Sequence, residues 1–260
     1  MTQPVKPLPP SEPEGDVKGT FIEHLSELRK RLIRMVLGIV VGMCVVGYFS
    51  TEIFRFVMRP VLNSLPEAER ALHYTGYLEP FMVYLKVALY GGTFVAAPYV
   101  LWQLWLFIAP GLYKREQKVV VPFLVSGTLL FYGGAAFCYF FVMKYAFPAL
   151  AAIAGEDMKP ILTMREQLSL ALAMMLGFGI VFEVPVIIAF LSMIGLVSAD
   201  FLARYRRHAI VFNTIVAAII TPTGDPFNLA LMAVPMILFY EIGILLARVL
   251  GKKKPAVASG

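Results

Sequence analysis

Long apolar segments separated by charged loops constrain this chain more than any other feature of its sequence. Apolar residues make up 59% of the 260 residues, and charged residues make up only 15%. Soluble domains average roughly 45–50% apolar and about 25% charged residues, so this chain has too few polar side chains to cover a soluble surface. The composition excludes a soluble enzyme, a disordered protein and a disulfide scaffold, and it predicts a membrane protein.

Six apolar spans are expected, at residues 35–50, 81–109, 119–143, 168–196, 209–220 and 229–250. A helix needs roughly 20 residues to cross a hydrocarbon core of about 30 Å, and the second, third and fourth spans meet this length. The spans do not alternate apolar and polar residues, so helices are favoured over barrel strands. The expected fold class is therefore an all-α integral membrane protein with six transmembrane helices.

The two ends of the chain differ in composition from these spans. Residues 1–19 are rich in Pro, Glu and Lys and lack an apolar stretch, so we expect a disordered cytoplasmic tail and not a signal peptide. Residues 20–250 are expected to form the six-span membrane domain, and residues 251–260 a basic cytoplasmic tail. Cys44 and Cys138 lie inside apolar segments and are interpreted as small hydrophobic residues.

The positive charges predict the orientation of the chain. Sixteen of the 23 Lys and Arg residues lie in the N-terminal segment, the second and fourth loops and the C-terminal tail, whereas the other loops hold six. Cytoplasmic segments carry such an excess, so both termini are expected in the cytoplasm. The net charge of +6 is interpreted as this topology signal, and no nucleic-acid partner is expected. Short interfacial helices are expected within residues 51–79 and 144–167, capping the outer surface.

Motifs of common soluble enzymes are absent from the sequence. It contains no GxGxxG, Walker or HExxH motif, and none of its three histidines lies in the middle of a span. We therefore expect no enzymatic activity, no catalytic residues, no metal site and no cofactor. The spacing of Gly38 and Gly42 is compatible with a close helix contact, although such pairs are common in membrane helices.

Two carboxylates near the cytoplasmic side have two interpretations each. Glu27 lies just before the first span and either pairs with Arg31 at i, i+4 spacing or accepts an incoming guanidinium group. Glu116 either stabilises a helix start, where the helix dipole favours a negative charge, or serves the same receptor role. Both lie among the cationic residues of the cytoplasmic side.

Glu183 is the only charged residue between Glu166 and Asp200 and lies near the middle of the fourth span. An ionised carboxylate at this depth costs at least about 2.5–3.5 kcal/mol, so protonation is the usual escape. Pro185 leaves the carbonyl of Val181 without its helical partner. Glu183 is therefore expected either to bond to this carbonyl or to an adjacent helix, or to face a partly wet groove and bond to a partner's transmembrane helix.

The fifth span is too short to cross the membrane as a regular helix. Twelve apolar residues, 209–220, cover only about 18 Å of a core of about 30 Å. Helix-breaking residues follow at once, so the tip of the hairpin should lie below the outer face, with a thinned bilayer or water near Asp225. In the alternative interpretation, the helix extends through residues 201–208 and spans the membrane with less tilt.

Five strings in order resemble the TatC family, the polytopic receptor subunit of the twin-arginine protein translocase. The strings are HLSELRKRL, FIAPGLYKREQK, FGIVFEVPV, TP…D and YEIGILLAR, and they extend over roughly Phe21 to Leu250. The resemblance implies six helices in a concave, glove-like arrangement in the inner membrane of a prokaryote. It also implies binding of twin-arginine signal peptides of folded proteins, and transport driven by the proton-motive force. Single-span subunits of the TatA and TatB type are the implied partners, within a larger complex that contains several copies of this chain.

The resemblance also assigns roles to particular residues. The implied signal-peptide-binding residues are Glu27, Arg29, Leu32, Phe107, Pro110 and Glu116. Glu183 is the implied contact for a partner helix, and Pro60, Asp225 and Glu241 are further candidate functional residues. The turn TPTGDPF is one residue longer than the family pattern, which leaves the match of Asp225 open.

Other function classes explain part of the sequence. A proton- or ion-coupled small-solute transporter would use Glu183 and Lys86, which both lie inside spans. Transporters of this kind have paired broken spans in repeated halves, whereas only the segment around Pro185 resembles such a break. An intramembrane hydrolase lacks a nucleophile and base within the spans, and a membrane scaffold without peptide recognition is the remaining alternative.

Overall fold

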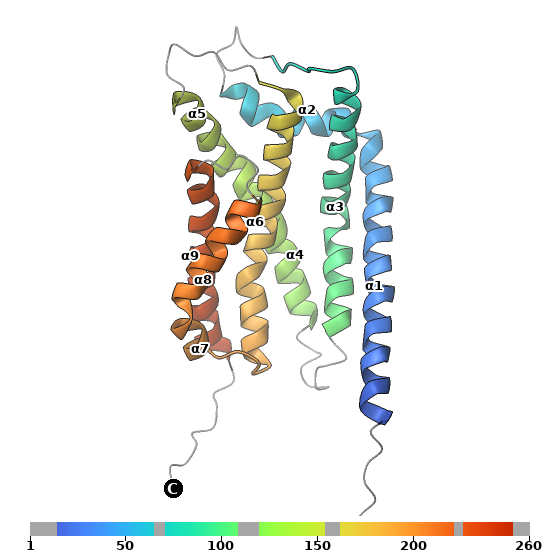
Figure 1. The fold of residues 1–260 in the computed structure, drawn as a ribbon, viewed down its shortest axis with the longest axis vertical. Helices are drawn as coiled ribbons and strands as arrows, with labels where there is room; N and C mark the ends of the chain where they lie inside the picture. The colour runs from blue at the N-terminus through green and yellow to red at the C-terminus, as the bar shows by residue number, and fades with distance from the viewer. Residues whose placement is uncertain (1–14, 65–70, 109–119, 154–161, 221–225, 252–260) are drawn as a thin grey trace, which may run out of the picture.

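The computed structural model describes residues 15–64, 71–108, 120–153, 162–220 and 226–251. Helices dominate these ranges, and the one bridge of β type within them is an isolated parallel pair between His73 and Thr163. Figure 1 shows most of the helices side by side along the long axis, which confirms the expected all-α fold. The helices are α1 (Gly15–Tyr48), α2 (Ser50–Asn63), α3 (Glu79–Ile108), α4 (Val120–Phe137), the π-helical segment η4 (Cys138–Val142), α5 (Met143–Ile153), α6 (Met164–Met193), α7 (Ala199–Arg204), α8 (Arg206–Ile220) and α9 (Pro226–Leu250).

Five helical segments of the described chain are long and apolar enough to cross a membrane. They are His24–Tyr48, Glu79–Ile108, Val120–Ala149, Met164–Met193 and Pro226–Leu250, and they overlap the first, second, third, fourth and sixth expected spans. Helix α1 begins at Gly15, inside the segment for which the sequence predicts a disordered tail. Extending an existing helix is far easier than starting one, which explains why α1 continues beyond its apolar part.

The fifth expected span corresponds to α8, which has only 15 residues. At 1.5 Å per residue it is about 22 Å long, less than a hydrocarbon core of about 30 Å. The backbone leaves the helical conformation at Tyr205, with φ −92° and ψ 15°, so α7 and α8 are separate helices. The alternative of one continuous helix through residues 201–208 is therefore wrong. In Figure 1 the upper ends of α8 and α9 lie lower than those of α3, α5 and α6.

Helix α2 lies across the upper end of the bundle (Figure 1). Its apolar residues Phe54, Val57, Met58 and Val61 recur at helical spacing and are buried against the bundle. This confirms the expectation of a short helix in residues 51–79. In residues 144–167 the outcome differs, because α4, η4 and α5 follow one another without a gap and the helix there continues the third span.

Glycines allow two pairs of helices to approach very closely. A Cβ atom added to Gly42 of α1 would lie 2.6 Å from the backbone oxygen of Gly92 of α3. A Cβ atom added to Gly134 of α4 would lie 2.5 Å from the backbone oxygen of Phe178 of α6. Small residues at such contacts let the backbones of membrane helices pack together. The spacing of Gly38 and Gly42 therefore marks a real helix contact, in which Gly38 faces the ring of Tyr99.

Helix α6 is the central helix of the bundle, and α1 lies at its edge (Figure 1). In the most apolar stretch of α6, 61% of the residues are buried, compared with 11% in α1. The core residue Phe178 of α6 is completely buried, as is Met58 of α2. A charged residue on α6 is therefore far more enclosed than one on α1, and this places Glu183 in an unusual environment.

Candidate functional site

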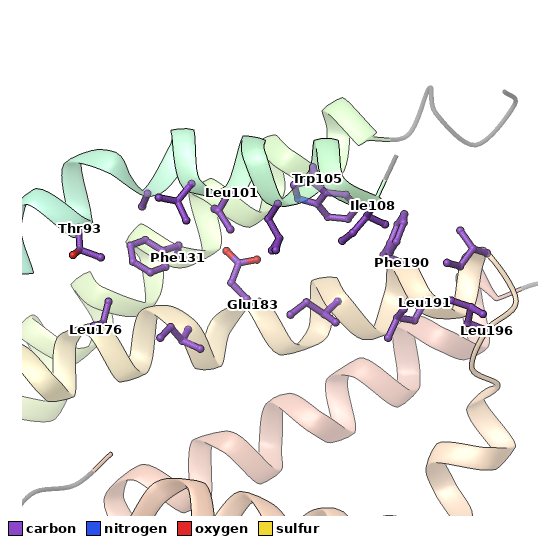
Figure 2. A pocket seen from close by; sticks show the side chains of 16 residues that line it. Thr93, Leu101, Trp105, Ile108, Phe131, Leu176, Glu183, Phe190, Leu191 and Leu196 are labelled. Atoms are coloured by element: carbon purple, nitrogen blue, oxygen red, sulfur yellow. The ribbon is translucent and has the colours of Figure 1, made fainter. Parts of the chain in front are cut away.

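An apolar groove between α3, α4 and α6 contains Glu183, and its volume is about 480 Å³. Its apolar lining comprises Ala97, Val100, Leu101, Leu104, Trp105 and Ile108 of α3, Phe131 of α4, and Leu176, Ile180, Ile187, Phe190, Leu191, Ile194 and Leu196 of α6 and the turn after it. Thr93 is the other polar residue of the lining. Figure 2 shows the Glu183 side chain pointing from α6 toward α3, between Phe131 and Trp105.

The Glu183 carboxyl group is enclosed and forms no hydrogen bond within the described residues. The residue is 9% exposed, and its Oε1 atom is buried without a hydrogen-bond partner among the described residues. Helix α4 approaches it at Gly127, where an added Cβ atom would lie 2.8 Å from Oε2. The expected local bond to the carbonyl of Val181 does not occur, and α6 stays helical through Pro185. An unpaired buried polar group costs about 1–3 kcal/mol, so a hydrogen-bonding group that enters the groove would bind favourably here.

The groove opens toward the side of the bundle. Ile180 and Ile187 precede and follow Glu183 by about one helical turn, and they are 52% and 47% exposed. Both line the groove together with Glu183. The buried carboxyl group therefore lies next to exposed apolar side chains on the side of the bundle.

The predicted signal-binding residues that are described gather at the opposite end of the bundle from α2. The ring of His24 on α1 stacks on the ring of Phe107 on α3, with centroids 4.5 Å apart and planes 22° apart. Arg29 and Leu32 of α1 are exposed, Leu32 by 55%. This contact brings the start of the α1 span to the end of α3. Pro110 and Glu116 lie outside the described residues, so the expected convergence of Glu27 and Glu116 stays a prediction.

Glu27 forms the intrahelical ion pair that is one of its two interpretations. The Nε and Nη2 atoms of Arg31 donate to Glu27 Oε1 at 3.0 and 2.5 Å. Both bonds use the same oxygen, and Oε2 has no hydrogen bond within the described ranges. A carboxylate accepts several hydrogen bonds on its two oxygens, so the pair with Arg31 leaves one oxygen for a second guanidinium group. The two interpretations of Glu27 are therefore compatible.

The further candidate residues have structural surroundings of different kinds. Pro60 lies inside α2 and is half-buried. Glu241 of α9 binds Arg206 at the start of α8, at 2.9 Å. The neighbouring Tyr240 donates its hydroxyl hydrogen to the carbonyl of Leu202 of α7, also at 2.9 Å. These two bonds hold α7 and α8 against α9. Asp225 lies outside the described residues.

A cluster of hydrogen bonds that the sequence did not predict joins the starts of α3 and α6. Glu79 accepts hydrogen bonds from the backbone nitrogen and hydroxyl of Thr75, at 2.7 and 2.9 Å, and from the backbone nitrogen of Arg165, at 3.2 Å. Lys86 donates to the hydroxyl of Ser169 at 2.7 Å, which explains how this charge is accommodated within a span. An acidic residue at a helix start was the available signal for Glu79, because helix N-termini favour negative charge.

A metal site within the described ranges of the chain would require several His, Cys, Asp or Glu side chains that lie close together. No group of three or more His, Cys, Asp or Glu residues in these ranges lies close enough to hold a metal ion. What these regions do offer is a carboxyl group in each, Glu183 in the groove and Glu27 on α1, that can form hydrogen bonds with another molecule.

Comparisons with known proteins agree with one another. The sequence pattern of the family described as Sec-independent protein translocase protein (TatC) matches residues 23–235. The TatC protein of Koribacter versatilis is 43% identical over 227 residues, which cover 86% of this chain and 83% of that protein. The TatC protein of Escherichia coli K12 is 38% identical over 228 residues, covering 88% of each chain.

The fold is similar to solved structures as well. A crystal structure of the twin-arginine translocase receptor TatC has a TM-score of 0.80 and is 35% identical to this chain. The similarity covers 87% of this chain and 99% of the crystallised one. Since the family pattern matches most of the chain and the close relatives are similar over most of their length, this chain belongs to the TatC family of Sec-independent protein translocase proteins.

Proposed function

We propose that this chain is the receptor subunit of a twin-arginine protein translocase in the inner membrane of a bacterium. The observation that carries the proposal is the structural similarity to a twin-arginine translocase receptor over nearly the whole length of that receptor. The relatives are named as translocase proteins and not as enzymes. In this proposal both termini lie in the cytoplasm, and the chain works in a complex with other subunits and further copies of itself.

The end of the bundle that holds Glu27 and Phe107 is the proposed binding site for the signal peptide. The Oε2 atom of Glu27, which has no hydrogen bond within the described ranges, supports this role, because a guanidinium group can donate a charge-assisted hydrogen bond to it. Glu116 is proposed as the second carboxylate, and Arg29, Leu32 and Pro110 as neighbouring contacts. Exposed single ion pairs contribute only about 0–1 kcal/mol, so recognition of two arginines requires both carboxylates.

The groove around Glu183 is the proposed docking site for a single-span partner subunit. An apolar helix fits an apolar lining, and one polar side chain on that helix would satisfy the unpaired Glu183 oxygen. The lateral opening at Ile180 and Ile187 supports entry from the membrane. A partner of the TatA or TatB type is the proposed occupant.

The small-solute transporter is not favoured. Its proposed coupling residues differ in their surroundings, because Lys86 is bonded to Ser169 near the start of α6 whereas Glu183 lies in a separate apolar groove. The similarity to translocase proteins over most of the chain points to protein export instead.

An export assay tests the proposed function. Deleting the gene should block the export of folded, cofactor-containing proteins that carry twin-arginine signals, and a plasmid copy should restore it. Export of unfolded chains through the general secretion route should continue, which serves as the control. Unchanged export of the folded reporter in the deletion strain would contradict the proposal.

A further inference from the structure

A second cavity, at the end of the bundle that carries α2, has a volume of about 430 Å³ and is positively charged. Its lining comprises Arg59, Pro60, Asn63 and Ser64 of α2 and Tyr139, Phe140, Lys144 and Pro148 of η4 and α5. The two walls are tied together at Tyr139. Its hydroxyl donates to the carbonyl of Phe56 at 2.8 Å, and its ring stacks on the Phe56 ring with centroids 4.6 Å apart. The cavity is therefore a fixed feature of the contact between α2 and η4.

Among the described residues, the two cations of this cavity have no acidic partner. Arg59 and Lys144 are both exposed, and neither forms an ion pair within the described part of the chain. The one acidic residue of α2, Glu52, lies in its first turn, two turns away from Arg59. Two like charges that line one cavity repel each other, and an anion between them replaces repulsion by attraction. The charge pattern therefore favours an anionic occupant.

The hydrogen-bond donors of the cavity indicate which kind of anion it can bind. Ser64 donates its hydroxyl hydrogen to the carbonyl of Val61 at 2.6 Å, and Tyr139 donates to Phe56, so neither hydroxyl has a hydrogen left for a ligand. The side chains of Arg59, Lys144 and Asn63 form no hydrogen bond within the described ranges. A guanidinium fork, an ammonium group and an amide together match the oxygens of a phosphate group.

The surroundings of the cavity indicate its depth in the membrane. Large aromatic side chains nearby are strongly exposed, including Phe140 by 61%, Phe141 by 58% and Tyr145 by 63%. Tyrosine and tryptophan side chains, such as that of Tyr145, concentrate where a membrane protein crosses from hydrocarbon to water. Helix α2, with one buried apolar face and exposed arginines, has the pattern of a helix that lies in this interface. Lipid phosphate groups lie in the same layer.

We propose that this cavity binds the phosphodiester group of a membrane phospholipid. Arg59, Lys144 and Asn63 bind the phosphate oxygens, and the apolar surfaces of Pro60, Phe140 and Pro148 contact the glycerol backbone and the start of the acyl chains. The lipid belongs to the leaflet at the α2 end, opposite the start of α1 and the end of α9 (Figure 1). The bound phosphodiester carries one negative charge, so it reduces the repulsion between the two cations and fastens α2 to α5.

Native mass spectrometry of the purified full chain, loaded with a phosphatidylglycerol and then delipidated stepwise, tests this site. The double variant Arg59→Gln, Lys144→Gln should lose one retained phospholipid. The charge-matched control Arg55→Gln, Arg165→Gln changes two exposed arginines at the same end that do not line the cavity, and it should retain the lipid. The conservative double variant Arg59→Lys, Lys144→Arg should retain it as well. Equal retention by the cavity variant and the control overturns the proposal.

Two further measurements distinguish a phospholipid from a free anion and from a lipid without phosphate. Millimolar inorganic phosphate should leave the phospholipid bound, and displacement by it would mean that the cavity holds a free anion instead. A phosphate-free glycolipid should not be retained, and equal retention of it would contradict phosphate recognition. If the double variant does not fold, the single variants Arg59→Gln and Lys144→Gln decide the matter. Each should weaken retention about tenfold, the value of one charge-assisted hydrogen bond, and unchanged retention in both overturns the proposal.

Discussion

At the scale of single residues, Glu183 is the side chain whose environment most needs an explanation. A carboxyl group in the middle of the central helix is unfavourable unless it has a partner, and none exists among the described residues. The position of Glu183 in the sequence was enough to predict a functional role, because a single charged residue in a long apolar span indicates function. The groove that surrounds it was not predictable, since its lining comes from three helices and looks like ordinary span sequence.

Substitutions of Glu183 separate folding from partner binding. Because the carboxyl group forms no hydrogen bond within the described chain, Glu183→Ala should fold with a thermal-unfolding midpoint close to that of the wild type. It should lose crosslinking to the partner helix and most of the export activity. Glu183→Gln should keep much of both, because an amide still donates and accepts hydrogen bonds. An alanine variant that crosslinks normally and exports at the wild-type rate contradicts the docking role.

At the scale of helices, the contact between α4 and α6 depends on the absence of a side chain at Gly134. Its added Cβ atom would overlap the backbone oxygen of Phe178 at 2.5 Å and the ring of Phe182 at 2.8 Å. A backbone atom cannot move aside without separating the helices. The Gly134→Ala variant should therefore lose about 1–3 kcal/mol of unfolding free energy, as overpacked cores do.

The adjacent glycine provides the control for this substitution. A Cβ atom added to Gly133 would meet nothing within 4 Å. Gly133→Ala should leave the thermal-unfolding midpoint unchanged or raise it slightly, because alanine favours helix more than glycine does. Thermal unfolding of both variants in the same detergent measures the difference. Equal midpoints for the two variants would show that α4 and α6 do not pack as described.

Helix α8 leads to a prediction about the membrane itself. Because α8 covers only about 22 Å, the turn after it should lie below the membrane surface, in a thinned or hydrated region. A cysteine at Thr223 should react with a membrane-impermeant thiol reagent more slowly than a cysteine within residues 154–161. The background should lack Cys44, which is exposed, and Cys138. Equal labelling at the two sites contradicts the thinning.

The helices themselves were largely predictable, and their contacts were not. Span lengths follow from apolar runs, so the long helices appear where the sequence predicts them. The break at Tyr205 has no such signal, because the residues on both sides of it are polar and helical. The third span extends into α5 because the residues after Lys144 are largely apolar, although the sequence predicts a separate interfacial helix there. Contacts such as that of Glu79 with Arg165 depend on tertiary packing, and the local sequence pattern carries no information about them.

At the scale of the whole molecule, the two proposed recognition regions lie at different places on the bundle. Figure 1 shows the start of α1 and the end of α3 at one end of the bundle and α2 at the other. The groove with Glu183 lies along the side of the bundle, between α3, α4 and α6. A peptide bound near Glu27 and a helix bound at Glu183 would therefore both contact α3. This arrangement gives a physical route by which signal binding and partner recruitment influence each other.

Photo-crosslinking of a twin-arginine signal peptide to this chain in membrane vesicles tests the receptor role most directly. The double variant Glu27→Ala, Glu116→Ala should reduce crosslinking roughly tenfold or more, because it removes charge-assisted hydrogen bonds to both arginines. The charge-matched control Glu52→Ala, Glu166→Ala changes two exposed carboxylates at the other end of the bundle and should crosslink as the wild type does. A twin-lysine signal should crosslink weakly to the wild type, since lysine lacks the planar fork of arginine. Crosslinking of the twin-arginine peptide that is equally strong in the double variant, the control and the wild type would contradict the account.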